Sequence, residues 1–330
     1  MSKAIVTGGA GFIGSHLVER LLREGVEVVV IDNYSTGRPE NLLSFEGHKN
    51  LTVVEADICD LQTIQPYFSG ADYVYHVAAL ADIVPSMQNP RVYHHSNVTG
   101  TVSVLEACRQ AQIRKFIYCA SSSCYGIPDK YPTDESAEIR PMYPYALTKY
   151  LGEEYVLHWS KVFKIPAISL RFFNVYGPRS RTSGTYGAVF GVFLAQKLKG
   201  LPFTVVGDGS QTRDFTFVTD IVDAMITAAE SPIQRDIFNV GSGATYSVNT
   251  LVGLLGGDVT YIPKRPGEPD CTFADICKIS SVLNWKPKVA LEQGVGEMLR
   301  HIDYWRAAPA WTPETIAVAT KEWHEYLGKA

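Results

Sequence analysis

Several features are missing from this chain of 330 residues. No apolar stretch approaches the roughly 18 residues that a membrane-spanning helix needs. The sequence also has no block of lysine or arginine, and its net charge is −4, so it lacks the basic pattern that binds a nucleic-acid backbone. Only 19% of the residues are charged and 46% are hydrophobic, which is ordinary for a globular protein. We therefore expect no membrane partner and no nucleic-acid partner.

Paired cysteines are missing too. The six cysteines contain no C-x-x-C pair and lie partly in apolar segments: Cys59, Cys108, Cys119, Cys124, Cys271 and Cys277. This pattern indicates reduced thiols. The sequence starts directly with a strand-like segment and shows no secretory signal, so we expect a cytoplasmic protein. His94 and His95 are adjacent and would point about 100° apart on a helix, so we expect no metal site.

Apolar runs of strand length alternate with helical patterns through the first half of the chain. Because the strands show no polar alternation, they predict a parallel sheet covered by helices on both faces. The fold class is therefore α/β, a Rossmann-type doubly wound sheet. The predicted strands are Lys3 to Thr7, Val26 to Asp32, Leu51 to Glu55, Tyr73 to Val77, Phe116 to Ala120 and Ile168 to Phe172, and the helices are Phe12 to Arg23, Thr101 to Gln110 and Ala146 to Phe163.

The residue pattern changes after Gly177-Pro178, where a glycine- and serine-rich segment, Ser180 to Gly187, begins. Further along, a helix near Val189 to Lys199, a strand at Phe203 to Val206 and a buried strand at Ile237 to Val240 are expected. We interpret residues 1–175 plus about 236–242 as an NAD-binding domain, and residues 176–235 and 243–330 as a smaller, discontinuous substrate-binding lobe. A terminal helix is predicted from Pro313 to Leu327, because Thr312 can cap it and proline suits its first turn; the sequence gives it no role.

A glycine loop, TGGAGFIG, lies between the first strand and the first helix. Gly8, Gly11 and Gly14 are spaced for a tight turn, backbone approach to a pyrophosphate and close packing of the helix on the sheet. The helix N-terminus then faces the phosphates. Asp32 ends the second strand 18 residues beyond Gly14, where a carboxylate accepts hydrogen bonds from a ribose diol and repels a 2′-phosphate. The glycine loop together with Asp32 therefore predicts NAD rather than NADP. A glycine turn without a ligand is the weaker interpretation.

A tyrosine and a lysine four residues apart, Tyr145 and Lys149, follow Pro144 and fall on one face of the predicted helix. A nearby ammonium group favours the phenolate, so we expect Lys149 to lower the pKa of Tyr145 toward use as a base. Ser121 ends a predicted strand at the carboxyl edge of the sheet, where ligands of such folds bind. The three residues together predict hydride chemistry at an alcohol or sugar carbon.

These motifs resemble the extended short-chain dehydrogenase/reductase family. The similarity extends over nearly the whole chain, through HVAAL (His76 to Leu80), RFFNVYGPR (Arg171 to Arg179), GDGSQTRDF (Gly207 to Phe215) and RPGE (Arg265 to Glu268), and points to the nucleotide-sugar branch, most like 4-epimerases of UDP-glucose and UDP-N-acetylglucosamine. The resemblance implies catalytic residues Ser121, Tyr145 and Lys149. It implies contact of the cofactor with the catalytic pair and with Gly8, Gly11, Phe12, Ile13, Gly14, Asp32, Asn33, Asp57, Ile58, Ala78, Ala79, Asn97 and Phe172. The substrate residues it implies are Ser86, Ser122, Ser123, Asn174, Val205, Arg213, Arg265 and Glu268, with the two arginines on the diphosphate.

The outcome of the reaction depends on the residues after Ser121. Dehydratases of this family carry an Asp-Glu pair there, and decarboxylases carry a glutamate at the position of Ser123, whereas this chain has Ser122 and Ser123. Without that acid, a 4-epimerase that passes through a 4-keto sugar is expected. Thr272, where some members have a bulky aromatic, is expected to leave room for a 2-acetamido group.

Other interpretations remain open at this level. They are a 4,6-dehydratase, a decarboxylase, a 4-dehydrogenase that releases NADH, and a non-catalytic cofactor sensor, although sensors typically lack the catalytic tyrosine. The base could be uracil, guanine or cytosine. The resemblance also implies a homodimer through the helices near Thr101 to Gln110 and Ala146 to Phe163.

Overall fold

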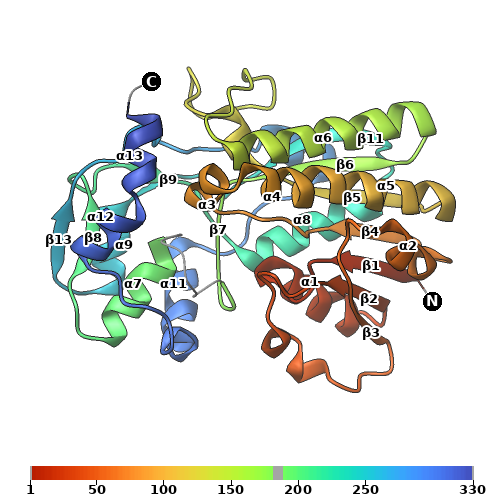
Figure 1. Ribbon diagram of the computed structural model, residues 1–330, viewed down its shortest axis with the longest axis horizontal. Coiled ribbons are helices and arrows are strands. Elements are labelled where there is room, and N and C mark those ends of the chain that lie inside the picture. The colour runs from red at the N-terminus through yellow and green to blue at the C-terminus, as the bar shows by residue number, and fades with distance from the viewer. Residues whose placement is uncertain (1, 181–188, 329–330) are drawn as a thin grey trace.

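The centre of the structure is a parallel sheet with the strand order β11-β6-β5-β4-β1-β2-β3 (Figure 1). The computed structural model describes residues 2–180 and 189–328, and within them this sheet has seven strands. Their bounds are β1 Lys3–Thr7, β2 Glu27–Asp32, β3 Leu51–Glu55, β4 Tyr73–His76, β5 Lys115–Ser121, β6 Ala167–Phe172 and β11 Arg235–Val240. From β1 the sheet is extended in one direction by β2 and β3 and in the other by β4, β5, β6 and β11. The strand order therefore switches between β1 and β4, and ligands of such folds bind at this point, beyond the carboxyl ends of the strands.

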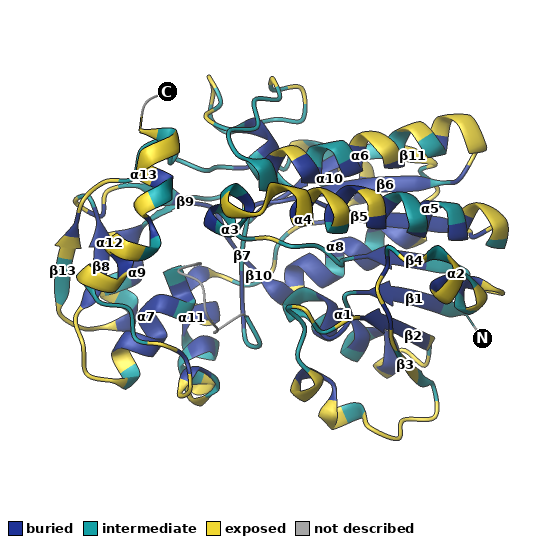
Figure 2. Cartoon of the chain, in the orientation of Figure 1, coloured by how far each residue is buried: buried dark blue, intermediate teal, exposed yellow. Residues whose placement is uncertain are grey.

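Helices cover both faces of the sheet, which confirms the predicted doubly wound α/β fold. One face packs against α1 (Phe12–Arg23), α8 (Val218–Glu230) and α10 (Cys277–Leu283). The other face packs against α2 (Leu61–Ile64), α5 (Gly100–Ala111) and α6 (Pro144–Phe163). The core is thus two apolar layers, one on each side of the strands. Figure 2 shows the buried residues along the central strands.

Burial differs between the central strands and the edge. All of β6 is buried, as the absence of polar alternation predicts. Strand β3 is largely exposed, because it lies at the edge of the sheet and has a neighbour on one side only. The expectation that helices cover every apolar parallel strand on both faces therefore does not hold for the edge strand β3.

The second lobe contains short two-stranded pairings and helices packed around an aromatic cluster. Strand β11 precedes most of this lobe's later part, yet it pairs with β6 in the main sheet. The elements of the lobe are β7 Asn174–Tyr176, α7 Val189–Leu198, β8 Phe203–Val206, β9 Thr212–Arg213, β10 Phe215–Phe217, β12 Tyr246–Ser247, α9 Val248–Leu255, β13 Val259–Ile262 and α11 Leu291–Arg300. Of the glycine- and serine-rich segment predicted at Ser180 to Gly187, all but Ser180 lies outside the described residues.

The chain ends in two short helices, where the sequence predicts one. Helix α12 spans Pro313–Ala319 and α13 spans Lys321–Leu327. The Thr312 hydroxyl caps α12 as expected. The break occurs at Thr320, whose backbone leaves the helical region and whose hydroxyl donates to the Ile316 carbonyl. The chain therefore changes direction, and α13 turns toward the first lobe. Within the described part of the chain, no helix is both long and apolar enough to cross a membrane.

Candidate active site

A single cavity of about 660 Å³ runs from the glycine loop to the second lobe. It begins at Gly11, the N-cap of α1, which has no side chain to cap the helix, so the first amide groups of α1 are available to a ligand. Gly8 has φ +70°, and a Cβ added there would lie 2.7 Å from the Cα of Ala78. Gly14 packs directly on the Gly8 carbonyl oxygen. The loop thus places peptide N–H groups and a helix N-terminus where a pyrophosphate fits, as the motif predicts.

Asp32 lines the same cavity at the carboxyl end of β2. One carboxylate oxygen accepts from the Ala10 amide at 3.0 Å and the other from the Tyr34 amide at 2.8 Å. Burial, which exceeds the effect of these hydrogen bonds, raises the pKa of Asp32 above its usual value. Each oxygen keeps a lone pair, so the carboxylate can still accept from a ribose diol.

Three further residues predicted to contact the cofactor are Asn33, Asp57 and Ile58. Ile58 is buried and lines the cavity, and Asn33 lines it from the exposed side. Asp57 does not line it; its carboxylate accepts from the Asn33 side-chain amide at 3.1 Å and from the Cys59 amide at 2.8 Å. The structure therefore places Asp57 outside the cavity lining, where its hydrogen bond orients the lining residue Asn33.

Ala78 and Ala79 line the cavity directly. Asn97, predicted as a third cofactor contact, is buried, and both of its amide N–H groups are used. It donates to the Leu80 carbonyl and the Thr148 hydroxyl and accepts from the Leu80 amide, at 2.9, 3.0 and 2.8 Å. Asn97 therefore clamps the loop after β4 to helix α6. It lies in a π-helical turn, His95–Thr99, between α4 (Pro90–His94) and α5. His94 and His95 are exposed.

Helix α6 presents Tyr145 to the cavity and Lys149 to the interior one turn later. A buried ion pair fixes the helix on the sheet: Glu153 accepts from the Arg171 guanidinium on β6, with a shortest distance of 2.5 Å. The Lys149 ammonium lies 4.4 Å from the centre of the Tyr118 ring, a favourable cation–π position. Tyr145 and Lys149 thus lie one turn apart on the same helix, as their spacing predicts. The Tyr145 side chain lines the cavity, whereas the Lys149 ammonium group is buried against Tyr118.

The electrostatic expectation for this pair differs from the structure. Burial raises the pKa of Tyr145 above its usual value, and a hydrogen bond with Ser121 opposes that rise. Burial also lowers the pKa of Lys149 to about 8. The prediction that Lys149 alone would bring Tyr145 toward neutrality is therefore wrong for these residues by themselves, because desolvation disfavours both charged forms.

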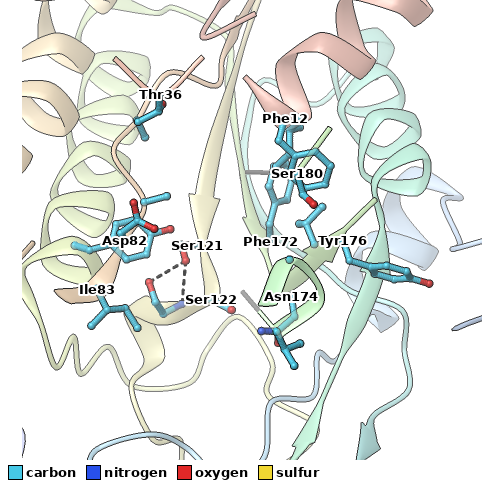
Figure 3. A pocket seen from close by; sticks show the side chains of 18 of the residues that line it. Phe12, Thr36, Asp82, Ile83, Ser121, Ser122, Phe172, Asn174, Tyr176 and Ser180 are labelled. Atoms are coloured by element: carbon cyan, nitrogen blue, oxygen red, sulfur yellow. Dashed lines mark hydrogen bonds between the residues drawn. The ribbon is translucent and has the colours of Figure 1, made fainter. Parts of the chain in front are cut away.

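Two serine hydroxyl groups link Tyr145 to a second tyrosine, Tyr143. The oxygens of Ser121 and Ser123 are 2.8 Å apart, Ser121 interacts with Tyr145, and Ser123 interacts with Tyr143. Figure 3 shows Ser121 with its two hydrogen bonds at the end of β5. The rings of Tyr143 and Tyr145 are nearly parallel, with centroids 6.3 Å apart. Ser122 also lines the cavity. This chain of hydroxyls can pass a proton between the two sides of the reaction centre.

Asp82 is the carboxylate that sequence reasoning missed. It follows the loop after β4, lines the cavity beside Ser121 (Figure 3), and its charge contributes to the raised pKa of Tyr145. Its position two residues after the HVAAL segment was the signal available, because loops at the carboxyl edge of the sheet form the site.

The second lobe contributes two arginines that share one acid. Glu268 accepts from Arg213 at 2.7 Å and pairs with Arg265 at 2.8 Å, and all three residues line the cavity. The two arginine side chains are at most 15% exposed. Two partly buried guanidinium groups held side by side suit a diphosphate, whose oxygens they can bind in pairs.

The other predicted substrate residues divide into two groups. Asn174 and Thr272 line the cavity, as does the predicted cofactor residue Phe172, and the Thr272 hydroxyl donates to Asn174 at 2.6 Å. Val205 is buried in the core, while its neighbours Thr204 and Val206 line the cavity, because alternate side chains of a strand point to opposite faces. The Ser86 side chain is buried on α3 (Ile83–Gln88), where it donates to the Ile83 carbonyl at 2.6 Å. For Val205 and Ser86 the structure shows no side-chain access to the cavity.

Two aromatic residues complete the wall without a signal in the sequence: Phe190 from α7 and Trp323 from α13. Nothing local in the sequence relates the C-terminal helix to a site built 300 residues earlier. Only the fold brings Trp323 to Arg265.

The glycine loop, the Tyr/Lys/Ser centre and the arginine pair thus lie along one cavity of an α/β fold, as in dehydrogenase-type enzymes that act on nucleotide-linked substrates. The family model for the NAD dependent epimerase/dehydratase family matches residues 4–241. The chain belongs to this family.

Individual relatives agree with this assignment. A UDP-glucose 4-epimerase of Mycolicibacterium smegmatis is 37% identical over 304 residues, covering 89% of this chain and 96% of that protein. The structure of a UDP-N-acetylglucosamine 4-epimerase from Methanobrevibacter ruminantium superposes with a TM-score of 0.87 at 34% identity, over 92% of this chain and 98% of that one. A UDP-glucuronic acid 4-epimerase from Bacillus cereus, solved with its substrate and NAD, gives 0.83 at 33% identity, over 91% and 99%.

A different activity occurs among the relatives as well. A UDP-glucuronic acid decarboxylase of Arabidopsis thaliana is 32% identical over 309 residues, covering 90% of this chain and 68% of that protein.

Proposed function

We propose that this protein is an NAD-dependent 4-epimerase of a UDP-sugar. The carrying observation is one continuous cavity that joins a dinucleotide cradle, the Ser121/Tyr145 hydroxyl pair and the Arg213/Arg265 pair. Its relatives in the family include 4-epimerases of UDP-glucose, UDP-N-acetylglucosamine and UDP-glucuronic acid. These named relatives also favour uracil as the base.

The residues of this chain divide the work as follows. Arg213 and Arg265 bind the diphosphate, and the sugar then lies between them and Tyr145. Tyr145 takes the proton of the sugar 4-hydroxyl, with Ser121 sharing that proton. NAD, when bound by the glycine loop and Asp32, supplies a hydride acceptor and later a hydride donor, and its oxidised ring carries a positive charge. Return of the hydrogen to the opposite face of C4, with the proton from Tyr145, gives the epimer.

The raised pKa of Tyr145 bears on this assignment. A phenol whose pKa is above its usual value needs positive charge nearby before it can act as a base at neutral pH. The Lys149 ammonium group, one helical turn after Tyr145, contributes positive charge, and the cofactor's charge would add to it. We therefore assign Lys149 to positioning and electrostatic support, and Tyr145 to proton transfer.

A lyase is the second candidate, and Asp82 is the observation that favours it. A carboxylate beside Ser121 could serve as the additional acid or base that dehydration or decarboxylation requires. Against this, the positions after Ser121 hold serines, and Asp82 comes from a different strand end. The serines keep epimerisation as the preferred function.

The deciding experiment incubates the purified protein with UDP-glucose, UDP-N-acetylglucosamine and UDP-glucuronic acid, and follows product mass, stereochemistry at C4 and absorbance of reduced cofactor. We expect a product of unchanged mass, inverted at C4, with no accumulation of NADH. Loss of 18 or 44 mass units would instead identify a dehydratase or a decarboxylase, and stoichiometric NADH a dehydrogenase.

We further propose two units: an NAD-binding domain, residues 1–175 plus about 236–242, and a substrate lobe formed by residues 176–235 and 243–330, of which α8 and α10 pack on the sheet of the first unit. A homodimer through α5 and α6 is supported by the stripe of exposed apolar side chains Leu147, Tyr155 and Val162 on α6, which are 45, 38 and 50% exposed. All six cysteines are free thiols, which supports a cytoplasmic location. Light scattering of wild type and a Leu147→Glu, Val162→Glu variant tests the dimer: the variant should be a monomer.

A further inference from the structure

The C-terminal helices reach the substrate half of the cavity. Helix α13 packs against α3 of the first lobe and follows α12 of the second (Figure 1). Trp323, on α13, is 5% exposed and lines the cavity. Helix α12 is anchored through Ile316, which packs with Val206 and Ile262 of the adjoining strands. The end of the chain therefore connects the two lobes next to the site.

Trp323 holds the loop that carries Arg265 in two ways. Its indole Nε1 donates to the Pro266 carbonyl oxygen at 2.7 Å. Its ring lies 5.2 Å from the guanidinium carbon of Arg265, within the range of a cation–π interaction. The backbone of the loop and the arginine side chain are thus both fixed by one residue.

The same loop is enclosed at Gly267, which has φ +70°. A Cβ added at Gly267 would lie 3.2 Å from Met142 Cε and 3.6 Å from Leu327 Cβ. Met142 precedes α6 in the first lobe, and Leu327 belongs to α13. The loop is therefore packed between the segment that leads into Tyr145 and the terminal helix.

We propose that α13 is part of the nucleotide-sugar site, and that Trp323 is the positioning residue that fixes Arg265 for the diphosphate. The inference rests on the proposed function, because it assigns Arg265 to a nucleoside diphosphate. Glu268 draws Arg265 toward Arg213 from one side, and the Trp323 ring restrains it from the other. A guanidinium held on both sides loses little conformational freedom when the diphosphate binds.

The test uses full-length protein and four variants, of which Arg265→Leu is the reference for loss of the arginine itself. Trp323→Leu removes both the ring face and the N–H donor, and Trp323→Phe retains a ring. Tyr326→Ala changes an aromatic residue on the same helix that is 60% exposed, which makes it the matched control. We expect Trp323→Leu to raise the KM for the UDP-sugar and the dissociation constant for UDP about tenfold, with kcat within about twofold, since a cation–π contact of this kind contributes roughly one factor of ten. Trp323→Phe should recover most of the loss, and Tyr326→Ala should match wild type.

Calorimetric titration with UDP and thermal unfolding are measured on each variant. A Trp323→Leu protein that binds UDP within twofold of wild type, while Arg265→Leu binds it poorly, overturns the inference and leaves the proposed function intact. Equal losses in Trp323→Leu and Tyr326→Ala, or a fall in kcat alone, also overturn it, because they indicate general damage to α13. A wild-type protein that binds no UDP contradicts the proposed function and the inference together.

Discussion

The two halves of the cavity are built differently. The cofactor half comes from consecutive residues, the loop Thr7 to Gly14, together with the ends of β2 and β4. The substrate half is assembled from segments far apart in the chain, which include Asn174, Arg213, Arg265 and Trp323. Backbone groups dominate the first half and side chains the second. A phosphate cradle can therefore be recognised from a short motif, whereas substrate recognition depends on how distant segments pack.

The comparison also separates the chemistry from the binding. Tyr145, Lys149 and Ser121 belong to β5 and α6 of the first lobe, whereas Arg213, Arg265 and Thr272 come from the second. We expect changes in the first group to affect kcat and changes in the second to affect KM or substrate choice. Each of the following predictions can break this division.

The largest effect is expected for Tyr145→Phe. Removal of the phenol hydroxyl should lower kcat by at least about 10³-fold, because the proton acceptor is lost, while binding of UDP and NAD changes less than about threefold. Steady-state kinetics and calorimetry check this. Tyr155→Phe, on the same helix and 38% exposed, is the control. Retention of more than a few per cent of the activity would refute the assignment of Tyr145.

Arg213→Leu should act on binding. Loss of a guanidinium that pairs with a diphosphate, and of its bond to Glu268, should raise the KM for the UDP-sugar about 100-fold with a small change in kcat. Lys264→Leu removes a positive charge that is 63% exposed nearby and should change KM less than about threefold. If Arg213→Leu lowers kcat and leaves KM unchanged, the separation of the two lobes is wrong.

Lys149→Met should stabilise the fold while it impairs catalysis. Burial lowers the pKa of Lys149 from 10.5 to about 8, so below pH 8 the folded protein bears the cost of a buried ammonium group, roughly 3 kcal/mol from the shift. Between pH 8 and 10.5 the unfolded chain keeps a proton that the folded chain has released, and the cost disappears. The variant should therefore be more stable than wild type at pH 7, with a difference that shrinks as the pH rises through this window.

Denaturant unfolding at pH 7, 8.5 and 10 measures that difference. Lys161→Met, at an exposed position near the end of the same helix, is the matched control. A constant difference between Lys149→Met and wild type at all three pH values would show that the ammonium of Lys149 is not desolvated in the fold.

The smallest effect is expected at Thr272. Its side chain lines the cavity and bonds Asn174, so Thr272→Tyr should fill space near the sugar and lower the ratio of kcat/KM for UDP-N-acetylgalactosamine over UDP-galactose about tenfold. Thr52→Tyr, exposed on edge strand β3, controls for the substitution itself. Equal wild-type turnover of both sugars, together with an unchanged ratio in the variant, would remove Thr272 from substrate selection.

Much of the fold could be predicted because strands and amphipathic helices carry local patterns. Strands β1, β3 and β8 and helix α1 have the predicted bounds. The sequence predicts one continuous terminal helix, whereas the structure divides it at Thr320, and α13 packs against α3. That contact involves residues far earlier in the chain, which no local pattern records. The side chains of Asn97, Asp57, Ser86 and Val205 do not line the cavity, and their proposed contacts with ligands stay predictions. A motif names a residue but does not give the direction of its side chain.

The sequence by itself determined the parallel α/β fold, the nucleotide cradle and the pairing of Tyr145 with Lys149 on one helix, since these depend on residues within a few turns of each other. The tertiary structure decided which ionisable groups are buried and which side chains line the cavity together. It raised the pKa of Tyr145 and lowered that of Lys149, brought Asp82 to Ser121, and placed Trp323 on Arg265. Desolvation and contact between distant segments exist only after the two lobes have packed, so no stretch of sequence encodes them alone.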